Sequence, residues 1–261
     1  MVNCKKYKKR LNEVLKLNEL RVLPGNIAFF FVLALIPMIT VIVRFFSGYV
    51  NFIVNLINEI FPSGASNLII NFISSNNTVH LTFNIFTFII ASNGTLAIVN
   101  SANTLYHVDN RDFIKDRVKA LILLFILLIL LVFLIFVPVL GGIILGFFSK
   151  YSFYSKLLFI YNLLKWPITI FLIFFVLKII YVFAPDRVIK SSETTKGALF
   201  TTFIWTICTF VFGFYLQNIA NFNQVYGNLA NIIILMMWLY IISYVFVVGM
   251  AINYVKYQED K

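Results

Sequence analysis

The chain has 261 residues, of which 61% are hydrophobic, 18% aromatic and only 12% charged. A soluble domain carries about a quarter charged residues, so this composition excludes an ordinary soluble protein and indicates a polytopic helical membrane protein. The formal net charge of +11 would suggest nucleic-acid binding in a soluble protein. Here the basic residues lie between long apolar runs, where membrane topology explains them, and we expect no nucleic-acid partner.

Residues 1–23 are predicted to form a basic amphipathic helix on the cytoplasmic surface. The apolar residues of this segment recur at helical spacing instead of forming the continuous apolar core of a signal peptide: Leu11, Val14, Leu15, Leu17 and Leu20. The lysines of such a helix face anionic lipid headgroups.

Six later segments are long and apolar enough to cross about 30 Å of hydrocarbon at about 1.5 Å per residue. We expect these transmembrane helices at about 24–46, 80–106, 120–148, 157–184, 197–217 and 229–255, followed by a cytoplasmic tail at 256–261. Residues 47–79 contain two shorter apolar stretches interrupted by Asn and Ser, and we expect two short helices there on the outer face. The predicted fold class is therefore all-α, with six transmembrane helices.

An even number of spans places both termini on the same side of the membrane. Putting that side in the cytoplasm assigns 16 of the 21 Lys and Arg residues to cytoplasmic segments and leaves only Lys150 and Lys156 in outer loops. The positive-inside rule favours this orientation. We expect a multi-pass protein of the cell inner (cytoplasmic) membrane with both termini in the cytoplasm.

Polar residues recur along one face of the segment 80–106. Asn93, Ala97, Asn100 and Thr104 are separated by four, three and four residues, and Asn103 lies beside them. An unpaired amide costs several kcal/mol in lipid, so this face must contact other helices or water. One interpretation is a polar cavity opening toward the cytoplasm, lined by Asn93, Asn100, Asn103 and Thr104. The other is hydrogen bonding between helices, worth about 0.6–2 kcal/mol per contact.

A second stripe, of small and hydroxylated residues, follows one face of the segment 197–217: Thr202, Thr206, Thr209 and Gly213. Such residues let two helix backbones approach closely, so this stripe is predicted to be a helix-packing face.

Three cations lie within the apolar segments. Arg44 and Lys165 fall near the predicted outer boundary, and Lys178 lies about two turns before Pro185. Intramembrane cations are functional hypotheses by default, although snorkelling to the headgroups explains each of them. If Arg44 and Lys165 converge, they form an anion site suited to phospholipid headgroups or other envelope phosphates.

The connection after the second predicted span is densely charged. Arg111 and Arg117 are expected to contact lipid phosphate or a neighbouring cytoplasmic loop. Asp112 and Asp116 have a spacing that can hold a metal ion. The alternation of acids and bases favours mutual ion pairs on a solvated helix instead, and we predict no metal site.

Several local patterns occur in a fixed order along nearly the whole chain. They are Asn26–Phe29, Ala34–Pro37, Ser92–Gly94, Asn103–Tyr106, Arg111–Phe113, Arg117, Tyr181, Pro185, Gly197–Ala198, Tyr215, Tyr226–Gly227, Trp238–Tyr240, Gly249 and Asn253. This ordered set resembles the YihY/BrkB family of bacterial inner-membrane proteins, formerly mislabelled ribonuclease BN. The chain departs from that family at Gly249–Ala251, where the family commonly has Gly-Ala-Glu, and at Ala34, where Ser is usual. The resemblance therefore implies no mechanism that needs the missing carboxylate.

The sequence argues against an enzyme. His80 and His107 fall on opposite membrane faces in this topology, so they cannot share a metal or serve one catalytic triad. The chain also has no Gly-rich phosphate loop, no CxxC motif and no intramembrane acidic pair. We predict no catalytic residues and no cofactor.

A facilitator or transporter of a lipid or other envelope component is the function that the polar stripe and the boundary cations favour. Its partners would be membrane lipids and an envelope lipid or small amphipathic substrate. The alternative is a non-catalytic membrane scaffold or assembly partner in envelope biogenesis. Polar faces that are dry and bonded to each other would favour this alternative.

Overall fold

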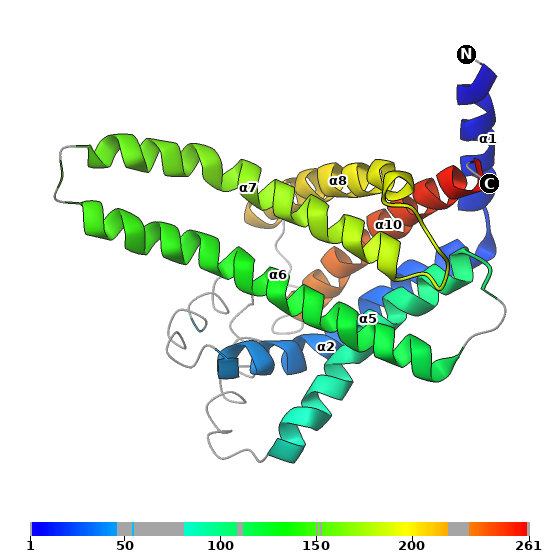
Figure 1. The fold of residues 1–261 in the computed structure, drawn as a ribbon, viewed down its shortest axis with the longest axis horizontal. Coiled ribbons are helices and arrows are strands. Elements are labelled where there is room, and N and C mark those ends of the chain that lie inside the picture. The colour runs from blue at the N-terminus through cyan, green and yellow to red at the C-terminus, as the bar shows by residue number, and fades with distance from the viewer. Residues whose placement is uncertain are drawn as a thin grey trace.

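The computed structural model is all-helical, with no strand among the residues that it describes (Figure 1). These are residues 2–45, 54, 81–108, 112–149, 151, 153–218 and 230–259. Within them, side chains are described except at 2–6, 18–19, 35–45, 81–87, 130–144, 216–218 and 230–232. The helices are α1 (Val2–Leu15), α2 (Asn18–Phe45), α5 (Leu81–Leu105), α6 (Phe113–Phe148), α7 (Tyr154–Phe183), α8 (Ser191–Asn218) and α10 (Ala230–Glu259).

The described helices include several that are long and apolar enough to cross a membrane. Three meet this criterion by length and composition, namely Tyr154–Phe183, Ser191–Tyr215 and Ile233–Glu259. The pair Tyr7–Leu15 and Leu20–Ala34, bent by 61°, makes a fourth if it is one span. The protein is therefore a multi-pass membrane protein. The count of six spans stays a prediction, and the two outer-face helices fall in a region of which only Val54 is described.

The N-terminal region is divided between two helices. The chain turns at Lys16 and Leu17, where Leu17 N donates to Val14 O at 3.1 Å. Helix α2 begins at Asn18 and runs on through Pro24, so residues 18–23 share one helix with the predicted first span. Asn is a favoured residue at a helix start, which fits this boundary. Helix α1 packs against α10, where Tyr7 Oη donates to Ile252 O at 3.2 Å.

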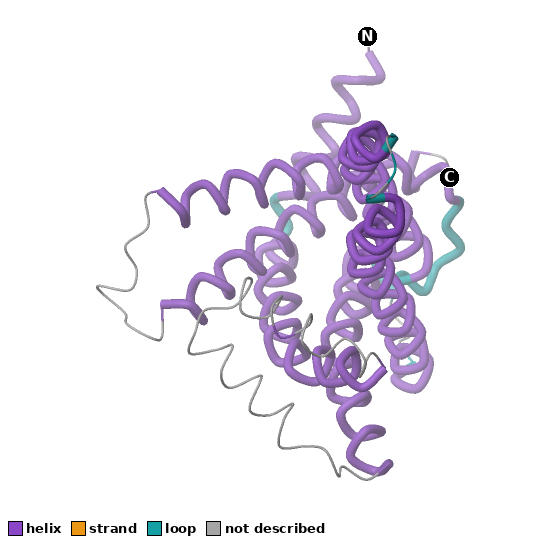
Figure 2. The backbone as a smooth tube through the Cα atoms, turned by 90° about the vertical axis from the view of Figure 1, so that its left-hand side faces the viewer, coloured by secondary structure: helices purple, strands orange, loops and turns teal. Residues whose placement is uncertain are grey.

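The long helices form a closed ring. Each contacts the next in the order α2, α5, α6, α7, α8 and α10, and α10 contacts α2 again. Figure 2 shows this arrangement from one end of the bundle. Helix α1 and the C-terminal end of α10 lie at the same end of the bundle, beside the α5–α6 and α7–α8 connections (Figure 1). We call this end the junction end.

Burial is concentrated toward the junction end. Leu105, Leu123, Tyr181, Ala198 and Met250 are almost completely buried there. By contrast, residues 154–175 of α7 and 203–215 of α8 include no buried side chain. Among the described residues, the buried core therefore lies toward the junction end, and these stretches of α7 and α8 have exposed or half-buried side chains.

The tightest helix contact joins α8 to α10. A methyl group added at Gly197 would collide with Gly249 O and with Asn253 Oδ1. One added at Gly249 would collide with Thr201 Oγ1 and the Tyr181 hydroxyl. Only glycine allows the two backbones to approach this closely, as in small-residue contacts between membrane helices.

Polar side chains reinforce this contact. Gly197 N donates to Asn253 Oδ1 at 2.8 Å, and the Tyr181 hydroxyl lies 2.8 Å from Thr201 Oγ1 and donates to Phe246 O at 2.9 Å. These bonds tie α7, α8 and α10 together next to the two glycines.

Replacing Gly197 by Ala should lower the free energy of unfolding by about 1–3 kcal/mol, because the added methyl overpacks the α8–α10 contact. The matched control is Gly213→Ala in the same helix, where an added methyl meets nothing within 4 Å. Alanine lowers the backbone entropy of the unfolded chain, so this substitution should leave the free energy of unfolding unchanged or raise it by up to about 1 kcal/mol. Thermal unfolding of the purified protein in detergent measures both. Equal effects of the two substitutions would contradict the close approach.

Candidate functional site

A tight turn ends α5 at the junction end. Val108 N donates to Asn103 O at 3.0 Å and His107 N donates to Thr104 O at 3.2 Å, which is the hydrogen-bond pattern of a Schellman motif. His107 adopts φ 50°, the left-handed conformation that this motif requires. The turn directs the chain toward α6 and leaves His107 O free to accept from Arg187 Nη2 at 3.0 Å.

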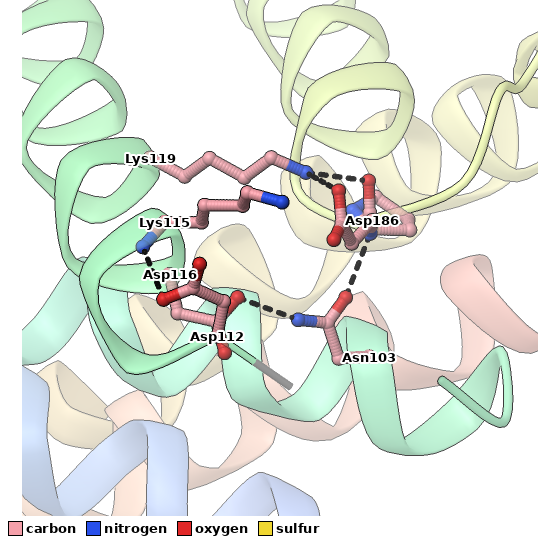
Figure 3. Close-up of polar contacts among 7 residues, drawn as sticks. Asn103, Asp112, Lys115, Asp116, Lys119 and Asp186 are labelled. Carbon is pink, nitrogen blue, oxygen red and sulfur yellow. Dashed lines mark hydrogen bonds and ion pairs between the residues drawn. The ribbon is translucent and has the colours of Figure 1, made fainter. Parts of the chain in front are cut away.

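Asn103, in the last turn of α5, is the centre of the candidate site. It is completely buried, and both ends of its amide are bonded (Figure 3). Its Nδ2 donates to Asp116 Oδ1 of α6 at 2.9 Å, and its Oδ1 accepts from Asp186 N of the α7–α8 connection at 2.7 Å. One side chain therefore joins three segments of the chain.

The start of α6 presents the carboxylate that Asn103 contacts. Asp112 caps the helix by accepting from Ile114 N at 3.0 Å. Asp116, in the first turn, is 5% exposed and turns toward Asn103. A carboxylate here is favoured by the positive end of the helix dipole. Of the two described acids, one caps the helix and the other bonds an amide, while the ion pairs expected of Asp109 and Arg111 stay a prediction because these residues lie outside the described ones.

An ion pair lies beside the amide contact. Lys119 Nζ is 2.9 Å from Asp186 Oδ1 and also donates to Pro185 O at 3.1 Å (Figure 3). The hydrogen bond and the charge of Lys119 hold the pKa of Asp186 below its ordinary value. We call the four residues Asn103, Asp116, Lys119 and Asp186 the junction network. It joins the end of α5, the start of α6 and the α7–α8 connection by polar contacts, beside the apolar core that includes Leu105 and Leu123.

Arg117 makes a separate contact with α5. Its Nη1 donates to Asn93 Oδ1 at 2.8 Å and its Nη2 donates to Ile89 O at 3.1 Å. The arginine thus bonds α5, and its predicted contact with lipid phosphate stays a prediction.

The residues predicted to line a polar cavity differ in burial and in hydrogen-bond partners. Asn103 is dry and bonded to protein, and Asn93 is half-buried and bonded to Arg117. Asn100 is half-buried, and its backbone carbonyl accepts from Thr104 Oγ1 at 2.8 Å. Hydrogen bonding between helices therefore accounts for two of the amides, and a cavity along this stripe stays a prediction.

The residues of the hydroxylated stripe of α8 also differ in burial. Thr202 is buried and its Oγ1 donates to Ala198 O at 2.8 Å. Thr206 and Thr209 are exposed, and Gly213 is half-buried. The stripe therefore lies in a helix contact at Thr202 and emerges from it toward the opposite end.

The predicted cation sites are only partly described. Lys165 is half-buried and its Nζ lies 6.0 Å from the ring centroid of Trp166. The side chain of Arg44 and the whole of Arg111 lie outside the described residues, so convergence of Arg44 with Lys165 stays a prediction. Lys178 Nζ lies 6.0 Å from the ring centroid of Phe174, the residue one turn toward the start of α7.

Several polar groups of the structure were not predicted as site residues. Asp186 and Lys119 lie in segments counted only as positive charge, and no sequence pattern pairs them. Three buried side-chain atoms lack a partner among the described residues, namely Ser101 Oγ, the Tyr106 hydroxyl and Asn253 Nδ2. Within the same part of the chain, no group of three or more His, Cys, Asp or Glu side chains is placed to hold a metal ion.

Comparison with known proteins identifies relatives over most of the chain. The family model described as virulence factor BrkB matches residues 13–261. A ribonuclease-like protein of Bacillus subtilis (strain 168), YfkH, is 28% identical over 248 residues, covering 91% of this chain and 90% of that protein.

Shorter matches include two UPF0761 membrane proteins. That of Prosthecochloris aestuarii is 33% identical over 84 residues, covering 32% of this chain and 19% of that protein. That of Chromobacterium violaceum is 33% identical over 81 residues, covering 31% and 19%. No solved structure matches this chain.

The ion pair of the junction network predicts a pH-dependent stability difference between the wild type and Asp186→Asn. Because the folded-state pKa of Asp186 lies below its unfolded value, its contribution is complete above the unfolded pKa of about 3.9 and is lost as the pH falls through the folded-state pKa. The pair is partly exposed, so we expect about 0.2–1 kcal/mol at pH 7.

Thermal unfolding of both proteins between about pH 7 and pH 3 measures this difference. Other carboxylates titrate equally in the two proteins and cancel. The difference should shrink below about pH 4 and also in about 1 M salt. A difference that is the same at every pH would show that Asp186 acts through its backbone and shape alone.

Proposed function

This chain belongs to the virulence factor BrkB family of membrane proteins, and on that premise we propose that it transports a lipid or another small amphipathic component of the cell envelope. The protein would lie in the inner membrane with both termini in the cytoplasm, as the distribution of Lys and Arg favours. The structure would then be the state in which the junction end, on the cytoplasmic side, is closed.

The observation that carries this proposal is the contrast between the two ends of the bundle. At the junction end, Asn103 and the ion pair of Lys119 with Asp186 cross-link three helices. Toward the other end, α7 and α8 run for many residues without a buried side chain. In the proposed transporter, the junction end would be the closed gate, and alternating access would open it by moving one part of the bundle against another.

Closure by polar contacts is suited to reversible opening. Each intramolecular hydrogen bond contributes only about 0.5–1.5 kcal/mol net, because water replaces it when the partners separate. Apolar side chains that are buried at the same end, among them Leu105 and Leu123, add to the cost of opening. A substrate that binds the open state more tightly would supply the energy that both contributions require.

The proposal is a non-enzymatic one, although one relative is described as ribonuclease-like. Metal-dependent phosphodiester hydrolysis needs several carboxylates that are free to hold ions. In this chain Asp112 is occupied as a helix cap, and Asp116 and Asp186 are bonded to Asn103 and Lys119. These acids, which belong to the part of the chain that the structure describes, support structure.

A membrane scaffold is the second candidate, and one observation favours it. The amides of Asn93 and Asn103 are already bonded to protein, as expected of polar groups that only hold helices together. In that case the polar stripe needs no water-filled path.

Reconstitution in liposomes with fluorescent phospholipid separates the two candidates. The informative variant is Asn100→Leu, because Asn100 is the half-buried amide of the stripe and lies outside the junction network. Loss of one polar contact of about 1–2 kcal/mol should slow lipid transfer by about five- to thirtyfold. The double variant Asn100→Leu with Asn103→Leu should remain folded and be inactive.

The matched control is Asn162→Leu, at an exposed position of α7, which should transfer lipid at the wild-type rate. If liposomes with the wild-type protein transfer fluorescent phospholipid no faster than empty liposomes, phospholipid transport is excluded. The scaffold is then the remaining candidate. If Asn100→Leu transfers lipid at the wild-type rate, the polar stripe does not line the transport path.

A further inference from the structure

Arg117 is held in the seam between α5 and α6 by neutral acceptors. Asn93 Oδ1 and Ile89 O each accept one hydrogen bond from its guanidinium. A guanidinium carries five N–H donors in a rigid plane and is always charged. The two bonds therefore fix the orientation of the group, while its charge stays uncompensated and donors remain for a further acceptor.

The acids of the described residues near Arg117 are used elsewhere. Asp116, the preceding residue, bonds Asn103, which lies ten residues further along α5 than Asn93. Asp112 caps α6, and Asp186 pairs with Lys119. Within the described ranges, Lys119–Asp186 is the ion pair that the structure shows. Arg117 thus lacks a carboxylate partner there.

The guanidinium lies where an apolar, outward-facing surface begins. One face of α6 exposes large apolar side chains at helical spacing: Ile114, Val118, Ile122, Phe125 and Ile129. On the α5 side of the seam, Ile89 is 41% exposed. In a membrane protein such a face contacts acyl chains, and a charge beside it is costly unless an anion accompanies it.

We infer that Arg117, oriented by Asn93, binds the phosphate of a phospholipid whose acyl chains lie along the exposed face of α6. The planar donor fork of arginine matches the oxygens of a phosphate, which would complete the hydrogen bonds and neutralise the charge. The site lies where the second turn of α6 meets the middle of α5, because Arg117 follows the start of α6 closely and its partners Asn93 and Ile89 lie well before the end of α5. This site goes beyond the proposed transport function and does not depend on it.

A purely structural role for Arg117 makes a different prediction. If the arginine only links α5 to α6, its removal lowers stability and leaves lipid binding unchanged. If it binds a phosphate, its removal weakens binding of phosphate-bearing lipids in particular. The test must therefore measure lipid occupancy and stability separately.

The experiment is native mass spectrometry of the full-length purified protein titrated with phosphatidylglycerol. Arg117→Gln should weaken the first bound lipid by about tenfold or more, the loss expected for a charge-assisted hydrogen-bonded pair. Arg117→Lys keeps the charge without the fork and should fall in between. The matched control is Arg187→Gln, which removes the same charge at the same end and the bond to His107 O. This control should change binding by less than about twofold, because it lies outside the seam.

Two further arms identify what is bound. Diacylglycerol with the same acyl chains should bind the wild type no better than it binds Arg117→Gln. Millimolar inorganic phosphate should not displace phosphatidylglycerol, because it lacks the chains that lie on α6. Displacement by free phosphate would make this a site for the ion alone and overturn the lipid assignment.

Asn93→Ala keeps the proposal testable if Arg117→Gln does not fold. It keeps the charge of Arg117 and removes the hydrogen bond that orients its guanidinium, so lipid binding should weaken by about threefold while the protein stays folded. Equal lipid binding by the wild type and by all Arg117 and Asn93 variants would refute the site. An equal loss in Arg187→Gln would show that the attraction is only general electrostatics. Neither result bears on lipid transfer across liposomes, so failure of this site and failure of the proposed function are distinguishable.

Discussion

The buried amide of Asn103 is the constraint on which the junction end depends. An amide away from water must have its donor and its acceptor satisfied, and a dry Asn103 finds these partners in Asp116 and in the backbone of Asp186. The partners belong to the start of α6 and to the α7–α8 connection. Once they are in place, Lys119 lies close enough to Asp186 to form the ion pair. The position of three helix ends therefore follows from one side chain.

The rest of the ring divides into a part that is fixed and a part that is free to separate. On the side of α8 and α10, Gly197 and Gly249 bring the backbones into contact, and Tyr181 bonds both helices. This contact is made by shape and cannot loosen gradually. The junction network is polar and can exchange its contacts for water. In the proposed transporter, the glycine contact would be the fixed part and the junction network the closure, whereas a scaffold would need only the first.

The sequence predicted the all-helical membrane fold and the polar face of α5, because apolar periodicity and composition report directly on lipid exposure. It also gave hydrogen bonding between helices as one interpretation of that polar face. It could not predict that Asn103 contacts Asp186, since that contact depends on how α5, α6 and α7 cross. Asp112 and Asp116 were interpreted through their neighbours in the chain, whereas the second is bonded to another helix. Gly197 and Gly249 were noticed only as part of a family resemblance, and their close approach became visible in the structure.

The most direct test of this account is the distance between the start of α6 and the α7–α8 connection in the presence and absence of the Asn103 amide. Spin labels at Ile114 and Val188, which are 72% and 94% exposed, report it by pulsed electron paramagnetic resonance in lipid nanodiscs. Leaving Asp116 unpaired costs about 1–3 kcal/mol. Asn103→Ala should therefore add a longer-distance population that Asn162→Ala does not produce. The same single distance distribution in the wild type and in Asn103→Ala would show that the junction end is held closed by something other than this amide.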